Sequence, residues 1–218
     1  MKNAQFWTWR REIAVTLIAT GSAVALVATA GAGVSHASEG PVSIPASSLS
    51  ADGKFFTPGP NTVVKRNAGA TETRSELAQN VAPVSPAPAG TTDYYAIKNA
   101  HWISQSCGTN VIQQTSGQGK TTLVLSVEKS VAATVTKEVN VDLKYISAGM
   151  GWSVTNTYSV KNETRYEVPS GKFGTVQAFP LYDVFVGDAW SGAGGRFPTG
   201  KKVYAYKPVG VCFNQWLR

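Results

Sequence analysis

The sequence predicts an all-β fold, either an elongated antiparallel sheet or a sandwich, with one long β-hairpin and a disordered leader before it. Apolar and polar residues alternate over residues 123–145, where ten of the twelve odd positions are apolar. The same period of two returns over residues 152–168, and no segment sustains the 3.6-residue period of an amphipathic helix. Aromatic residues are frequent after residue 91, as expected for a β-rich core.

The N-terminus has the pattern of a secretory signal peptide. Lys2, Arg10 and Arg11 form a basic region, and an apolar stretch over residues 13–34 leads to small residues at the two positions that a signal peptidase reads, the second being Ala37. We therefore expect residues 1–37 to be removed by cleavage after Ala37 and the protein to be secreted. The alternative is an uncleaved membrane anchor, because the stretch is close to the roughly 20 residues that span a bilayer.

Residues 38–90 differ in composition from the rest of the chain. Seven of the 11 prolines lie there, with many Ser and Ala and no Trp or Tyr. Such a composition buries too little apolar surface to offset the entropy of ordering. We predict a flexible leader and linker over residues 38–90, with a short helix over residues 71–79 as an option, and an all-β domain over residues 91–218.

The charge of the mature chain is mildly basic. Removal of residues 1–37 leaves 17 basic and 12 acidic residues, a net charge of +5. Lys201-Lys202 is the only adjacent basic pair in the C-terminal half, which is typical of a solvated loop and not of a nucleic-acid interface. Attraction to an anionic cell surface stays open.

The two cysteines, Cys107 and Cys212, are predicted to form a disulfide. An even pair in an exported protein is more often bonded than free. The bond would close a loop of about 105 residues, which the chain-entropy model values at about 4 to 5 kcal/mol.

Strand signals run through the whole of the predicted domain, with a turn at residues 169–171 and a loop at residues 191–195. The predicted strands are residues 94–97, 101–104, 111–114, 123–145, 152–168, 175–186, 203–206 and 209–213.

The two longest runs are predicted to pair as a hairpin, with arms at about residues 123–147 and 152–168 and a two-residue turn at Ala148-Gly149. The apolar positions are odd in the first arm and even in the second, so this turn brings apolar residues opposite one another. Tyr145 would face Trp152. The apolar face of the predicted hairpin is Val139, Val141, Leu143, Tyr145, Trp152, Val154 and Tyr158.

The sequence offers little catalytic chemistry. Residues 116–122 superficially look like a phosphate-binding loop, but Gln114 stands where that motif needs Gly, and a strand follows in place of a helix. We therefore expect no nucleotide. His101 is the one histidine left after cleavage, and no nucleophile-elbow motif accompanies it, so a hydrolase triad with Ser104 or Ser106 is disfavoured.

Other site types are equally poorly supported. We expect no metal or cofactor, because paired cysteines and a single histidine leave no zinc ligand set. Asp183 and Asp188 could be read as a glycosidase carboxylate pair, although only their spacing suggests it. A carbohydrate-binding surface made of Tyr182, Phe185 and Trp190 is a better interpretation of that segment. We predict that the protein is not an enzyme.

The long Ser/Thr/Val-rich strands, the run from Trp152 to Val160 and the exit through Tyr166-Glu167-Val168-Pro169-Ser170-Gly171 resemble the elongated β module of aerolysin and epsilon-toxin-type pore-forming proteins. The resemblance covers roughly residues 121–186. It implies binding to a target membrane, assembly of several copies and insertion of a hairpin. Lys137 and Asn156 limit the clean apolar face to seven residues in each arm. The chain also resembles small secreted proteins of Gram-positive filamentous bacteria.

Three functions follow from these observations. The first is a secreted, non-enzymatic β protein, in its most concrete form a pore-forming-toxin-like module that acts on membranes. The second is a cell-envelope or carbohydrate-binding β domain that does not insert. The third is an enzyme or an enzyme inhibitor.

Overall fold

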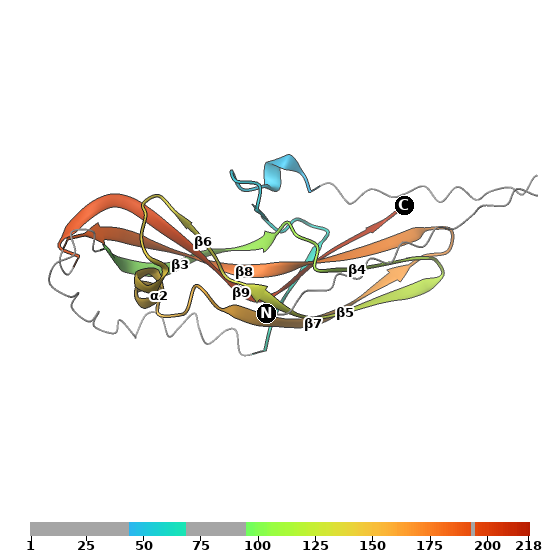
Figure 1. Ribbon diagram of the computed structural model, residues 1–218. Helices are drawn as coiled ribbons and strands as arrows, with labels where there is room; N and C mark the ends of the chain where they lie inside the picture. The colour runs from blue at the N-terminus through green and yellow to red at the C-terminus, as the bar shows by residue number, and fades with distance from the viewer. Residues whose placement is uncertain (1–43, 69–94, 193–194) are drawn as a thin grey trace, which may run out of the picture. The chain divides into compact units, whose positions relative to one another are not determined.

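Two antiparallel sheets form the part of the chain that the computed structural model describes, residues 44–68, 95–192 and 195–218 (Figure 1). The larger sheet has seven strands in the order β1-β3-β8-β9-β2, with β4 also paired to β8 and β6 to β9. The smaller sheet consists of β5 and β7. The prediction of an all-β, antiparallel fold is confirmed. The predicted signal peptide, its cleavage site and residues 69–90 of the leader lie outside the described residues.

The first four strands and the last two belong to the larger sheet, and the chain alternates between the sheets only from β4 to β8. In order, the elements are η1 (Ala46–Ser48), β1 (Phe55–Phe56), β2 (Thr62–Arg66), β3 (Tyr95–Gly108), β4 (Gln113–Gln118), β5 (Thr121–Ala132), β6 (Thr134–Lys137), α2 (Leu143–Met150), β7 (Thr157–Val168), β8 (Phe173–Ser191) and β9 (Phe197–Leu217).

The longest strand pair is β8 with β9, which runs from Gly174 opposite Leu217 to Ser191 opposite Phe197. The sequence predicts two separate strands where the structure has the single strand β9. Pro208 lies within β9 and faces Tyr182, next to a register shift at which Val209 of β9 is the extra residue. Proline has no backbone N–H, so it is tolerated in a strand at such an irregularity.

The predicted single strand over residues 123–145 is divided in the structure into β5 and β6, and it is wrong beyond Lys137. The chain leaves β5 at Ala132, pairs β6 with β9, and then forms the helix α2. The Asp142 carboxylate caps this helix by accepting a hydrogen bond from the Lys144 amide at 2.9 Å, and Gly151 ends it in the left-handed conformation at φ 72°. The proposed turn residues Ala148 and Gly149 therefore lie inside a helix. A Cβ on Gly149 would come within 2.4 Å of Ile97, so the helix packs closely on β3.

The predicted hairpin register is also wrong. Residues 152–156 precede β7, and β7 pairs with β5 from Thr121 opposite Val168 to Ala132 opposite Thr157. Glu163 faces Ser126, whereas the predicted turn would place it beside Thr134.

Part of the predicted flexible leader is ordered in the structure. Within residues 44–68, β1 pairs with β3 and β2 pairs with β9. The side chains of Phe55 and Phe56 are 4% and 3% exposed. These short strands are stabilised by pairing with the edges of β3 and β9. The average composition of residues 38–90 does not indicate such long-range pairing.

Buried side chains gather on both faces of the larger sheet. Val176 and Ala178 of β8 face β5 and β7, whereas Phe179 and Leu181 pack with Phe56 of the N-terminal segment. A third cluster lies around α2 and includes Ile146 and Met150. The larger sheet is therefore covered on one face by the smaller sheet and on the other by the segment that begins at Ile44 and leads into β1 (Figure 1).

Candidate functional site: the β5–β7 ribbon

The two-stranded sheet of β5 and β7, here called the ribbon, is the most clearly amphipathic unit of the described structure. Each arm has 12 residues. Its inner face packs on Val176, Ala178, Val211 and Phe213 of the larger sheet. The buried apolar residues of that inner face are Leu123, Leu125, Val127, Val131, Val160 and Val168.

The outer face of the ribbon is polar, and its side chains pair across the two strands. Lys161 forms an ion pair with Glu128 at 3.2 Å, and the Ser126 hydroxyl donates to the Glu163 carboxylate at 2.6 Å. The hydrogen bonds from Ser126 and Arg165 lower the pKa of Glu163. Because these partners face one another in the ladder, the outer face favours the observed register.

The ribbon shares no β ladder with the larger sheet in the described residues. Three side chains take the place of a ladder, and we call them the edge clasp. Asn67 accepts a hydrogen bond from the Lys161 amide at 3.0 Å and donates to the Ser159 carbonyl at 2.7 Å. Lys65 donates to the Glu163 carbonyl at 2.5 Å. On the other arm, the Gln113 amide donates to the carbonyl of Ser126 at 2.9 Å.

The edge clasp occupies backbone groups of two edge strands that would otherwise be open to pairing with another strand. The Asn67 side chain imitates a neighbouring strand, since it both accepts from and donates to the same stretch of β7. Its own backbone N–H is bonded to the Val209 carbonyl of β9 at 2.8 Å. Apolar packing and reversible polar bonds therefore hold the ribbon in place.

A buried carboxylate anchors the segment that carries Lys65 and Asn67. Asp183 of β8 is 1% exposed and accepts hydrogen bonds from Arg66 at 2.8 and 2.7 Å. Trp102 and Gln105 donate to the same carboxylate at 3.1 and 3.2 Å. The bond with Asp183 raises the pKa of Arg66. Four N–H donors therefore bond the Asp183 carboxylate, and it anchors Arg66 to β8.

Most residues of the predicted apolar face of the hairpin lie close together in the structure, but they are not on the two strands of a hairpin. Val141, Trp152 and Val154 are buried in the cluster around α2. Val139, Tyr145 and Tyr158 pack against that cluster, whereas Leu143 is 39% exposed. Tyr158 is the one member of this set that belongs to the ribbon. Six of the seven residues therefore meet in one cluster, but they come from a loop, a helix and β7 and not from one face of a hairpin.

The predicted aromatic binding surface is not formed. Tyr182 and Phe185 are 7% and 0% exposed, because both faces of β8 are covered. Trp190 is half-buried, with the Lys98 ammonium 4.3 Å from its ring centroid.

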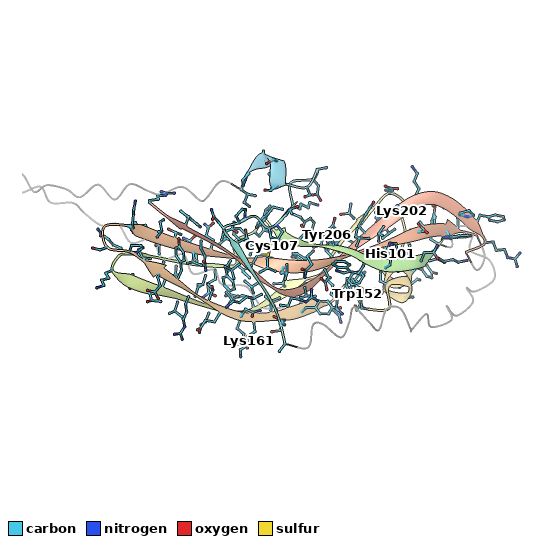
Figure 2. All side chains as sticks on the ribbon, turned by 180° about the vertical axis from the view of Figure 1, so that it is seen from behind. His101, Cys107, Trp152, Lys161, Lys202 and Tyr206 are labelled. Carbon is cyan, nitrogen blue, oxygen red and sulfur yellow. A yellow bond between two sulfur atoms is a disulfide. The ribbon has the colours of Figure 1, made fainter. Side chains whose placement is uncertain are left out.

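Four of the polar residues weighed as catalytic candidates, His101, Ser106, Asp183 and Asp188, have structural partners. The exposed ring of His101 lies 2.8 Å from the Asn99 carbonyl through Nδ1, and Ser106 donates to the Phe56 carbonyl at 3.1 Å. Asp188 bonds Lys202 and Asn99. Figure 2 shows His101 and Lys202 toward the same end of the long strands, away from Cys107.

The predicted disulfide between Cys107 and Cys212 is confirmed. It joins β3 to β9, the two strands that flank β8, and is fully buried among Phe56, Phe179 and Leu181.

The anchor and the edge clasp could not be found in the sequence, because Lys65, Arg66 and Asn67 lie in the segment predicted to be flexible. One signal was available: the β-branched pair Val63-Val64 favours a strand and is not typical of a Pro/Ser/Ala-rich linker.

A scan against protein-family models finds no match to this chain, and a search of curated proteins finds no significant match. Over the described ranges, no helix has the length and apolar character needed to cross a membrane. Likewise, no three His, Cys, Asp or Glu side chains of residues 44–68, 95–192 and 195–218 are grouped so as to hold a metal ion.

Proposed function

We propose that this chain is a secreted, non-enzymatic β protein that acts on membranes by releasing the ribbon from the larger sheet into a lipid bilayer. The observation that carries the proposal is the ribbon itself: two arms of 12 residues, apolar on one face, with no ladder to the rest of the sheet. A membrane-crossing β-strand needs about 9 to 11 residues.

The free-energy cost of such a transfer has two parts. The inner face of the ribbon exchanges one apolar environment for another, but Val176, Ala178, Val211 and Phe213 of the larger sheet lose their cover and need a new apolar partner. The side-chain hydrogen bonds of the edge clasp are also lost. Each of these is worth roughly 1 kcal/mol. The polar outer face would need to stay in contact with water.

Thr164, Lys129 and Asn162 are polar residues of the inner face, and they set a condition on this transfer. Thr164 is opposite Leu125, is 3% exposed and accepts a hydrogen bond from Gln215 of β9 at 3.0 Å, which the transfer would break.

Lys129 stands opposite Val160, three residues from the end of β5, so its long side chain can reach the lipid headgroups. Asn162 stands opposite Val127 near the middle of the ribbon and now donates to the Lys65 carbonyl at 3.2 Å. In a bilayer this amide would need a new partner.

The test uses a single reporter thiol, which is feasible because the two native cysteines are bonded to each other. Val131→Cys places a polarity-sensitive dye on the inner face, and Ser130→Cys places it on the outer face one residue away. Ser116→Cys on β4 is the control, since β4 belongs to the larger sheet. Each labelled protein is mixed with liposomes that contain a self-quenched dye and, in parallel, with liposomes that carry a lipid-attached quencher.

We expect release of the trapped dye, with quenching of the label at position 131 and none at positions 130 and 116. Equal quenching at all three positions would mean adsorption of the whole protein and would overturn the proposal. Failure to release dye from any lipid mixture, with no quenching at position 131, would favour a surface-binding module that does not insert.

A further inference from the structure

The turn between β8 and β9 carries the most exposed large apolar side chain of the described structure. Phe197 is 64% exposed and stands opposite Ser191 at the end of the strand pair. Trp190 pairs with Pro198 beside it and is half-buried. We call Trp190, Phe197 and the basic residues around them the tip.

The Phe197 ring is seated on the turn and does not project freely. A Cβ on Gly192 would lie 2.9 Å from the ring, so glycine is required for this contact, and its φ of +81° also favours glycine. Thr199 donates to the Ala189 carbonyl at 2.6 Å, which holds the following residues of β9 in place. The fold therefore already restricts the Phe197 side chain, so binding through the tip would lose little side-chain conformational entropy.

Positive charge surrounds this aromatic surface. Lys98 donates to the Gly195 carbonyl at 2.8 Å and places its ammonium 4.3 Å from the centroid of the Trp190 ring. Arg196 and Lys201 are exposed, and neither belongs to any ion pair between described residues. The Lys202 ammonium is bound to Asp188, and this bond raises the pKa of Lys202. Figure 2 shows Lys202 near the end of the sheet.

An exposed aromatic ring flanked by cations is the chemistry of the interface between lipid headgroups and acyl chains. Aromatic side chains bury their rings at that depth, and each nearby Lys or Arg adds attraction to anionic headgroups. We infer that the tip is a docking surface for anionic membranes, with Phe197 as the apolar anchor and Arg196 and Lys201 as the headgroup contacts.

This inference rests on the proposed membrane action but has its own readout, which is partition of the protein onto vesicles. The protein is sedimented with vesicles of phosphatidylcholine alone and of phosphatidylcholine mixed with phosphatidylglycerol. We expect binding to the mixed vesicles, weak binding to the neutral ones, and loss of binding at high salt.

Two matched pairs of variants locate the surface. Phe197→Ser should lower partition by about 10-fold, whereas Ile103→Ser, which removes an apolar side chain that is 41% exposed on β3, should leave it unchanged. Arg196→Gln with Lys201→Gln should lower it by about 30-fold at low salt. Lys54→Gln with Lys172→Gln removes two exposed charges elsewhere and serves as the charge control.

The inference would be overturned by equal binding to both kinds of vesicle, or by control variants as impaired as the tip variants. Binding to a protein or glycan that needs Phe197 but no lipid would overturn it as well. Partition that depends on the tip without dye release would support the tip and contradict insertion of the ribbon. Dye release that does not depend on Phe197 would support insertion of the ribbon and contradict the role of the tip.

Discussion

Arg66 donates two hydrogen bonds, of 2.8 and 2.7 Å, to the carboxylate of Asp183, and thereby joins β2 to β8 across the intervening strand β9. Gly210 of β9 permits this approach, because a Cβ there would lie 2.1 Å from the Lys65 carbonyl oxygen. The same short stretch of β2 and its end carries Lys65 and Asn67, which hold the ribbon. One buried ion pair therefore positions the edge clasp.

Removal of the arginine should be costly. Arg66→Ala leaves the Asp183 carboxylate buried with two of its four donors, and breaking a buried pair in this way destabilises a protein by about 3 to 5 kcal/mol. Urea denaturation measures the free energy of unfolding. Arg165→Ala, on a side chain that is 72% exposed, is the control and should cost less than about 0.5 kcal/mol.

The double variant Arg66→Met with Asp183→Leu separates lost charge pairing from lost packing. It removes both charges and should recover most of the stability that Arg66→Ala loses. A double variant as unstable as the single one would show that packing of the Arg66 side chain, and not its charge, is what matters.

Loss of the edge clasp should show in hydrogen exchange of the ribbon. Asn67→Ala removes the acceptor of the Lys161 amide, and a hydrogen bond worth roughly 1 kcal/mol corresponds to about fivefold faster exchange. Exchange measured by NMR or mass spectrometry should rise over residues 159–163 and remain unchanged in β8. Asn61→Ala, on an exposed asparagine of the same segment, is the control. Unaltered exchange at Lys161 would mean that apolar packing alone holds the ribbon.

The ion pair of Asp188 with Lys202 should contribute to stability only above acidic pH. Hydrogen bonds from Lys202 and Asn99 lower the pKa of Asp188 in the folded protein below the value of about 3.9 expected in the unfolded chain. Stability from this group is therefore fully present above about pH 4 and is lost as the pH falls through the lowered pKa. The melting temperature of Asp188→Asn should fall less steeply between pH 5 and pH 2 than that of the wild type. Parallel curves would exclude Asp188 as a source of acid sensitivity.

The disulfide should contribute strongly to stability, because it links strands 105 residues apart in the sequence. Replacing both Cys107 and Cys212 by Ser should lower the free energy of unfolding by about 2 to 5 kcal/mol. Reductant should lower the melting temperature of the wild type and leave that of the double variant unchanged. A wild-type protein insensitive to reductant, even after unfolding, would show that the bond does not form in the purified protein.

The pairing of β5 with β7 shows what alternation along the sequence predicts and what it leaves open. The apolar positions of β5 are odd and those of β7 are even, as the sequence indicates, and both the predicted and the observed register pair odd with even residues. Every such register keeps apolar residues on one face, so the pattern restricts the pairing without selecting one register. The Asp142 cap and the Gly151 stop place a helix where the predicted arms would continue, and the cross-strand pairs of the outer face favour the observed register.

The N-terminal segment illustrates the opposite limit. Its composition is that of a linker, and no local pattern indicates that Phe55 and Phe56 are buried. Their burial depends on Phe179, Tyr182 and Tyr206, which lie more than 100 residues away along the chain. A short segment of sequence gives no indication of contacts with residues so far away along the chain.

What the sequence alone determined about this protein was local or compositional: the β class, the wet and dry faces of residues 121–131 and 157–168, and two cysteines able to pair. The tertiary structure decided the strand order, the ribbon register, the helix over residues 143–150 and the burial of Tyr182 and Phe185. The physical reason is that alternation reports which face of a strand avoids water. Only non-local packing determines what covers that face.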